Sequence, residues 1–442
     1  MNNIMFLARL LVLFSLVCIS CAHSSFEQKQ LKHALDFATS NRLELEILLQ
    51  HYTYDSLKLE AAKFLIRNMP HCYSYQQGGE MDSVKRVRTY YSPFGQIDQT
   101  YARRWGHYTY RNLLKIYDAH IITAEYLIDN IDRAFDNWQK RPWNRSLSFE
   151  DFCEYLLPYR IGDEPLEEWR ELYEKKYGYL LDSIYKGSDV VEAANLVSRH
   201  LQEPVFIYCE DFELPHIGPR YLFSHRYGSC VDAADIVTYA FRAVGIPCME
   251  DTDARGGHVW NVVRDTTGRD VPIWYIASEA VRGSRDTGGY KRGKVYRPMY
   301  GFQEEKAAHL GDDWKSMPLL FYHPYMKDVS YAYYPDTLRI LTGIPDDEVC
   351  YLAHFHEAHW WSCACARSAS GKMEIPNLES ELVYLPMKYT KGNYYPSGFP
   401  FWFAGGEINT FLPDWEKTVK VRLYRKYPVY GWLRSFMGHV VG

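Results

Sequence analysis

The sequence predicts an α+β protein with a helical N-terminal region and a β-rich C-terminal end. Across residues 26–202, apolar residues recur at steps of three and four, as Leu31 and Leu35 do near the start. Across residues 310–442, short apolar or alternating runs are separated by Gly, Pro and Asn, which is typical of a β-sandwich. Between these regions, over residues 203–305, one apolar helix precedes two strands joined by a tight turn.

The composition is that of a globular protein and argues against a nucleic-acid partner. The chain has 442 residues, enough for about three domains. Hydrophobic residues make up 47% and charged residues 24%, so the chain can bury a core. Lys and Arg number 50 against 55 Asp and Glu, whereas proteins that bind nucleic acids usually carry a basic excess. The 10 cysteines are too sparse for a disulfide scaffold.

The first 21 residues are typical of an export signal. Residues 4–19 are apolar apart from Arg9, and this run is too short to span a membrane comfortably. The small residue Ser20 precedes Cys21, and this order resembles a bacterial lipoprotein signal in which Cys21 becomes the lipidated first residue. A plain cleaved signal peptide is the alternative. We therefore expect an exported, membrane-anchored lipoprotein, in the periplasm or at the cell surface.

The helical region is expected to contain several separate helices. Helical periodicity covers residues 26–68 and returns over 113–138, with a polar loop over 73–99 between them. Ser148, followed three residues later by Asp151, is a capping signal that opens the next helix. The remaining helical segments are residues 165–182 and 190–202.

Cys230 is the candidate nucleophile because it stands at the start of a helix. Ala234, Val237 and Phe241 form one apolar stripe after it, and Gly245 supplies the C-terminal cap. Amides and the helix dipole at a helix N-terminus lower the pKa of a thiol, and the same amides can hold an oxyanion. A small buried cysteine at a helix start is the structural alternative.

The next strand brings in a candidate base. Two glycines lead into His258, and the residues after it alternate as in a strand. The turn at residues 266–268 then starts a second strand over 271–276. A histidine at the mouth of a strand, facing a cysteine at a helix start, is the arrangement that a thiol needs for its general base.

The order of a helix-start cysteine, Gly-Ile-Pro and His-x-Trp-Asn over residues 227–279 resembles the transglutaminase-like branch of the papain-type cysteine enzymes. The resemblance implies a papain-like core over residues 203–305, in which a helix packs on an antiparallel sheet. It also implies that Cys230 is the nucleophile, that His258 is the base and that Trp260 packs beneath the pair. Further segments look like exported transglutaminase-domain lipoproteins of Bacteroides-type bacteria: residues 41–45, 64–70, 157–160 and 383–386.

The third member of the catalytic group departs from the family pattern. By the resemblance, the group that orients His258 would stand near Trp274, which is not an acid. Asp270 lies roughly 17 Å along the strand from the partner of His258 and cannot reach it. Glu279 lies just beyond the paired position and is our candidate for the acid, with Ser278 as a weaker hydrogen-bonding alternative.

A histidine- and cysteine-rich segment in the β-rich region invites a metal interpretation, which we do not favour. Its spacing fits residues alternating along strands better than paired zinc ligands. The residues are His354, His356, His359, Cys363 and Cys365. Trp360, Trp361 and Trp402 could stack on sugars, although core packing is the commoner role of such residues. We expect neither a metal nor a cofactor.

These observations predict an exported cysteine enzyme that transfers an acyl group from an amide in a peptide or glycopeptide. Cys230 would attack the carbonyl and His258 would carry the proton. Hydrolysis and transamidation share this acyl-enzyme, and the sequence does not separate them. The alternative is a catalytically inactive cell-surface protein that keeps the cleft and binds a peptide or glycan, because a dyad without its orienting acid loses orders of magnitude in rate.

Overall fold

The computed structural model describes residues 26–417 except for several short internal segments. These are 91–99, 101–103, 105–107, 204, 210–213, 256, 277, 286–290, 304–316, 342–344 and 357–358. The expected signal peptide over residues 1–21, including Cys21, lies outside the described residues. No helix in the described part of the chain is both long enough and apolar enough to cross a membrane.

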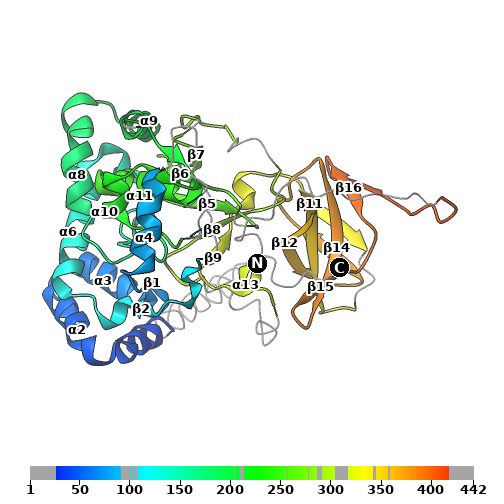
Figure 1. Cartoon of the computed structure of the whole chain (residues 1–442), viewed down its shortest axis with the longest axis horizontal. Coiled ribbons are helices and arrows are strands. Elements are labelled where there is room, and N and C mark those ends of the chain that lie inside the picture. The colour runs from blue at the N-terminus through cyan, green and yellow to red at the C-terminus, as the bar shows by residue number, and fades with distance from the viewer. Residues whose placement is uncertain are drawn as a thin grey trace, which may run out of the picture.

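The α+β class is confirmed. Figure 1 shows helices gathered at one end of the molecule, an antiparallel sheet in the middle and a second sheet at the other end. Residues 26–37 are helical. The helices that follow are α2 (Arg42–His51), α3 (Ser56–Asn68), α4 (Glu80–Val87), α6 (Ala124–Lys140), α7 (Phe149–Tyr155), α8 (Arg170–Tyr179), α9 (Val190–Leu201) and α10 (Pro219–Ser224).

Side-chain caps decide where two of these helices begin. The hydroxyl of Ser148 accepts a hydrogen bond from the amide of Asp151 at 3.1 Å and starts α7, as the sequence predicts. Thr123 caps α6 in the same way, accepting from the amide of Tyr126 at 3.2 Å. The helix expected from residue 113 therefore begins only after this cap.

The loop expected over residues 73–99 contains regular structure. β1 (Tyr73–Tyr75) pairs antiparallel with β2 (Lys115–Tyr117), and α4 buries Met81, Val84 and Val87. The apolar residues of α4 are few and stand among charged ones, so their periodicity was too short to predict a helix.

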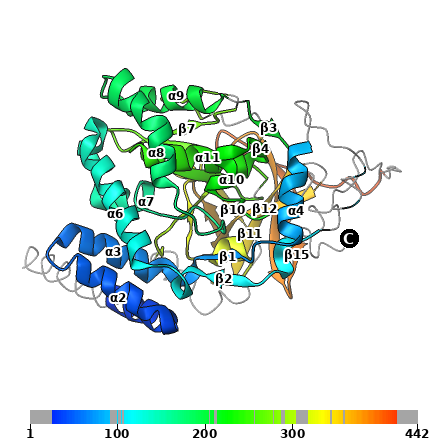
Figure 2. The same cartoon turned by 60° about the vertical axis from the view of Figure 1, so that its left-hand side comes forward.

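α11 (Cys230–Ala243) packs between α8, α9 and α10 on one side and the middle sheet on the other, and Figure 2 shows it near the centre of the helical layer. The sheet has the order β7-β6-β5-β8-β9, with every pair antiparallel. Its strands are β5 (Cys248–Asp253), β6 (Val259–Arg264), β7 (Asp270–Ile273), β8 (Val295–Pro298) and β9 (Met326–Asp328). β9 comes from beyond residue 310, so the middle sheet takes one strand from the segment that the sequence assigned to the C-terminal domain.

Gly245 follows α11 with φ of +80°, a conformation that favours glycine. A Cβ at this position would lie 2.8 Å from Cγ of Arg141 and 2.9 Å from the carbonyl oxygen of Asn137. The carbonyl of Gly245 also accepts from the indole of Trp143 at 2.9 Å. The end of α11 is thus fixed against the N-terminal helices, as well as against the sheet.

The C-terminal region is a six-stranded antiparallel sheet of order β12-β11-β14-β16-β17, with β15 on β14, and a separate pair, β10 and β13. The strands are β10 (Leu338–Leu341), β11 (Val349–His356), β12 (His359–Arg367), β13 (Lys372–Ile375), β14 (Leu382–Thr390), β15 (Asn393–Pro396), β16 (Phe401–Ala404) and β17 (Glu407–Thr410). Leu352, Met373 and Phe403 share one buried core between the pair and the sheet. Phe321, in α13 (Leu319–Tyr322), contacts Tyr351 in a second core.

Candidate functional site

Cys230 is the first residue of α11 and is 6% exposed. Ser229 is the N-cap, and it forms a capping box with Asp232, whose carboxylate accepts the amide of Ser229 at 2.8 Å. Arg88 pairs with the same carboxylate at 2.9 Å, and both partners are buried. Because the capping box engages the amides of Ser229 and Asp232, the amides of Cys230 and Val231 are the candidate oxyanion donors.

β6 runs parallel to α11, and Asn261 joins the two. Its side-chain amide donates to the carbonyl of Ala234 at 3.0 Å and to the hydroxyl of Thr238 at 2.9 Å. Near the C-terminal end of α11, Arg242 donates to the carbonyl of Cys248 at 3.3 Å. Cys248 pairs in the sheet with Val263, the last residue but one of β6. Cys230 stands four residues before Ala234, and residue 258 stands three residues before Asn261, so both lie towards the same end of the helix–strand pair.

The ring of His258 packs against two indoles. Trp260 is stacked on it, with centroids 5.6 Å apart and planes at 29°. Trp274 meets it edge to face, with centroids 4.6 Å apart and planes at 74°. His258 is 7% exposed, and its carbonyl accepts from the hydroxyl of Thr252 at 3.0 Å. Trp274 therefore does occupy the position next to the candidate base.

Asp253 holds the chain that leads into His258. Its carboxylate accepts the amides of Arg255 and Gly257, each at 2.9 Å, and pairs with the guanidinium of Arg255 at 2.8 Å. Sequence reasoning missed this residue, because its carboxylate supports the loop rather than the histidine ring.

A buried polar network lies behind Trp260. The indole of Trp260 donates to the hydroxyl of Tyr333 at 2.9 Å, and that hydroxyl donates to Asp251 at 2.7 Å. Arg297 binds both oxygens of Asp251, at 2.6 and 3.0 Å. Burial opposes the charge on Arg297, but Asp251 and its other anionic neighbours outweigh burial and hold the pKa of Arg297 above its ordinary value.

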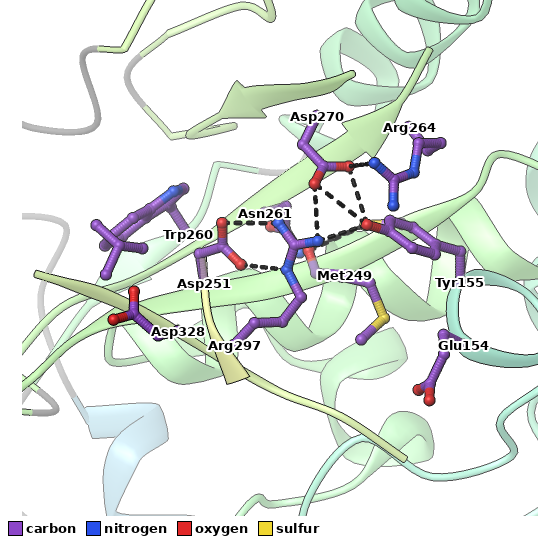
Figure 3. Close-up of polar contacts among 12 residues, drawn as sticks. Glu154, Tyr155, Met249, Asp251, Trp260, Asn261, Arg264, Asp270, Arg297 and Asp328 are labelled. Carbon is purple, nitrogen blue, oxygen red and sulfur yellow. Dashed lines mark hydrogen bonds and ion pairs between the residues drawn. The ribbon is translucent and has the colours of Figure 1, made fainter. Parts of the chain in front are cut away.

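Asp270 belongs to the far end of this network (Figure 3). Its carboxylate contacts Arg297 at 2.8 Å and Arg264 at 3.2 Å, and it accepts from the hydroxyl of Tyr155 at 3.0 Å. Arg264 is the register partner of Asp270 and stands six residues after His258 on the same strand, roughly 20 Å along it. Asp270 thus serves the ion-pair network at the opposite end of β6.

Glu279 and Ser278 are both exposed. The carboxylate of Glu279 lies 2.6 Å from the guanidinium of Arg199 on α9, with both side chains 52% exposed. The amide and carbonyl of Ala280 are held by Asn195, also on α9, at 2.8 and 2.9 Å. These contacts draw the chain after β7 towards α9 and give no support to an orienting role for Glu279.

A cavity of about 460 Å³ lies beside the start of α11. Its wall includes Ser229 and Val231, the two neighbours of Cys230 in the sequence, together with His216. Nδ1 of His216 lies 2.9 Å from a carboxylate oxygen of the buried Asp235. Burial opposes the charge on His216, but Asp235 outweighs it and holds the pKa of His216 well above its ordinary value. Sequence reasoning missed this pair, because no local motif joins the two residues.

A second cavity, of about 560 Å³, lies at the other end of β6. Its wall includes Arg264, Arg297 and Glu154. The carboxylate of Glu154 accepts the amides of Tyr300 and Gly301 at 2.9 and 3.1 Å, and burial raises the pKa of Glu154 to about 6. Its lining residues lie at the end of β6 opposite to residue 258, so we place this cavity outside the candidate site.

The histidine- and cysteine-rich segment lies on the paired strands β11 and β12. His354 is fully buried, and burial lowers its pKa to about 3. The thiol of Cys363 donates to the carbonyl of Leu352 at 3.4 Å. Among the residues that the structure describes, no three His, Cys, Asp or Glu side chains gather as metal ligands would.

No protein-family model matches this chain, and comparisons with curated proteins and with solved structures likewise find no match.

Proposed function

We propose that this protein is an exported cysteine enzyme that transfers an acyl group from an amide in a peptide or glycopeptide. The observation that carries the proposal is the parallel alignment of α11 and β6. It brings the end of α11 that begins with Cys230 to the end of β6 that His258 immediately precedes. We also propose that residues 203–305 form a transglutaminase-like core and that the C-terminal sheets form a β-sandwich.

The reaction would proceed through a covalent acyl-enzyme. The sulfur of Cys230 attacks the amide carbonyl while its proton passes to His258, and the resulting oxyanion accepts hydrogen bonds from amides at the start of α11. The C–N bond then breaks, and His258 returns the proton to the leaving amine. Water or a second amine finally attacks the thioester and restores the thiol of Cys230.

The cavity beside Ser229 and Val231 supports an extended substrate. Its volume of about 460 Å³ is in the range of known ligand pockets. It borders the start of α11 through Ser229 and Val231, while Cys230 and His258 are not themselves among the residues that line it. Its aromatic and charged lining, which includes Tyr73, Tyr325 and His216, suits a polar peptide or sugar more than a purely apolar ligand.

Thiol reactivity tests this proposal. With iodoacetamide at neutral pH, Cys230 should be alkylated faster than Cys248, whose pKa is raised to about 12 by burial. His258→Ala should slow the alkylation of Cys230 about tenfold or more, because the thiolate loses its proton acceptor. Peptide mass spectrometry after partial labelling measures both rates. Equal labelling of the two cysteines, or indifference to His258, would contradict the dyad.

A catalytically inactive binding protein is the second candidate. It is favoured by the pairing of the two acids considered from the sequence with other groups, Asp270 with Arg297 and Glu279 with Arg199. In that case wild-type protein incubated with a peptide thioester would accumulate no acyl-enzyme. Cys230→Ala would also bind the same peptide as tightly as the wild type does.

A further inference from the structure

We infer that Trp361, on the C-terminal sheet, is a positioning residue for the candidate base. It packs against Arg255, and Arg255 with Asp253 fixes the turn that ends at His258. This inference rests on the proposed acyl-transfer function. It concerns the backbone that carries His258, so it can fail while the Cys230–His258 dyad stands.

The turn between β5 and β6 begins at Asp253, whose polar groups hold the residues that follow. Its carboxylate accepts the amides of Arg255 and Gly257 at 2.9 Å each, and its own amide donates to the carbonyl of His258 at 3.4 Å. The same carboxylate pairs with the guanidinium of Arg255 at 2.8 Å, and the side chains of Arg255 and Asp253 are 8% and 0% exposed. Because the pair is buried, a low dielectric strengthens it, and the turn is held along its length.

The guanidinium of Arg255 lies against the chain next to His258. A Cβ built on Gly257 would be 3.3 Å from Nη2 and 3.4 Å from Cζ of Arg255. Gly257 is itself exposed to solvent, so displacing the guanidinium would leave it open on a further side. The position of Arg255 thus limits how far the residue before the candidate base can move.

Trp361 restrains the same guanidinium from the C-terminal sheet. Cζ of Arg255 lies 5.9 Å from the centre of a Trp361 ring, within the range of a cation–π contact. A guanidinium is planar and weakly hydrated, so it can pack on an indole while its N–H groups bind a carboxylate. The contact with Trp361 therefore supports the pairing of Arg255 with Asp253.

Trp361 has a rigid support, because its strand is fastened to the middle sheet beside it (Figure 1). The Trp361 indole donates to the carbonyl of His356, across the hairpin of β11 and β12, at 3.2 Å. Two residues after Trp361, the carbonyl of Cys363 accepts from the hydroxyl of Tyr296 in β8 at 2.7 Å. Tyr296 is the register partner of Thr252, the residue before the turn. The two sheets are thus joined close to the turn that Trp361 restrains.

Substitutions at Trp361 test the inference through the alkylation rate of Cys230 by iodoacetamide. Trp361→Leu should lower that rate about fivefold or more, because the turn that carries His258 gains freedom and a misplaced catalytic group loses rate steeply. Trp361→Phe, which keeps an aromatic ring, should retain most of the rate. Trp360→Leu is the matched control, since Trp360 is the adjacent residue of β12 but packs on Phe355, with ring centroids 5.1 Å apart, and against the second C-terminal core. It should leave the rate within about twofold, and thermal unfolding of each variant verifies that it is folded.

The pH dependence of alkylation separates positioning from a merely structural role. In Trp361→Leu the rate profile should shift to higher pH, towards that of His258→Ala, whereas Trp360→Leu should keep the wild-type profile. Adding His258→Ala to Trp361→Leu should lower the rate little further, because both act through one group. Arg255→Lys, which keeps the charge but not the planar fork, should also lower the rate, and it replaces Trp361→Leu as the test if that variant does not fold.

Three outcomes would overturn the inference while leaving the dyad intact. They are strictly multiplicative effects of Trp361→Leu and His258→Ala, equal rates in Trp361→Leu and Trp360→Leu, and a wild-type rate in Arg255→Lys. If His258→Ala has no effect in the wild-type background, the proposed function fails instead.

Discussion

The side-chain amide of Asn261 lies 2.9 Å from the hydroxyl of Thr238 and donates to it. This bond, with the second one to the carbonyl of Ala234, fixes the axial position of β6 against α11. Cys230 stands four residues before Ala234 and eight before Thr238, and His258 stands three residues before Asn261. The alignment of the candidate dyad therefore depends on Asn261, which is not a member of the dyad.

Asn261→Ala should therefore lower both stability and thiol reactivity. Losing two buried hydrogen bonds should reduce the free energy of unfolding by about 1–3 kcal/mol. The alkylation rate of Cys230 should fall and become less sensitive to His258→Ala. Urea unfolding and partial labelling measure the two effects, with the exposed Asn112→Ala as the control. Unchanged labelling in a destabilised Asn261→Ala protein would show that β6 is aligned by other contacts.

Glu279→Gln should leave the alkylation rate of Cys230 within about twofold of the wild type. The substitution removes an ion pair with Arg199 in which both side chains are 52% exposed, and such pairs contribute roughly 0–1 kcal/mol to stability. Arg199→Gln is the matched variant and should behave alike. A large fall in rate for Glu279→Gln alone would restore the acid predicted from the sequence.

Glu154 should make stability fall as the pH rises from about 4.5 to about 6. Its pKa is raised to about 6 in the folded protein, from an ordinary 4.5, so the folded state binds the proton more tightly in this window. Stability is then greatest below the window and declines through it, by about 1–2 kcal/mol. The difference in unfolding free energy between wild type and Glu154→Gln, measured by urea at pH 4.5 and 6.5, isolates this group. A difference that does not change with pH would refute the assignment.

Cys21→Ser should release the protein from membranes if Cys21 carries a lipid anchor. Fractionation of cells into membrane and soluble parts, with mass spectrometry of the mature N-terminus, is the measurement. Wild-type protein found wholly in the soluble fraction, with an unmodified N-terminus after residue 22 or later, would favour a plain cleaved signal peptide.

Local features of the chain were predictable because local interactions produce them. The Ser148 cap of α7 and the end of α11 at Gly245 follow from hydrogen bonds and backbone angles within a few residues. The same holds for the start of α11 at Cys230. The resemblance also put the position beside His258 near Trp274, and the structure brings the two rings into contact, since the pairing of two adjacent strands follows from one short turn.

Segments that depend on distant partners were not predictable. The sequence predicts a loop where the structure has α4. The few apolar residues of α4 are buried by contacts with residues far along the chain, which local periodicity does not report. β9 joins the middle sheet across more than twenty residues that separate it from β8. The sequence around α4 and around β9 has no pattern that predicts either element. Only packing against distant residues determines where the two elements form.

The sequence by itself determined the residues of the candidate dyad and the helix and strand that carry them. Tertiary structure decided what surrounds them: Glu279 pairs with Arg199, Asp270 with Arg297, and His216 with Asp235. Periodicity and capping report forces that act over three or four residues. The partner of a charged side chain is selected by geometry between elements that are remote in the chain. Where the pair is buried, as for Asp270 and Arg297, a low dielectric also strengthens the pairing.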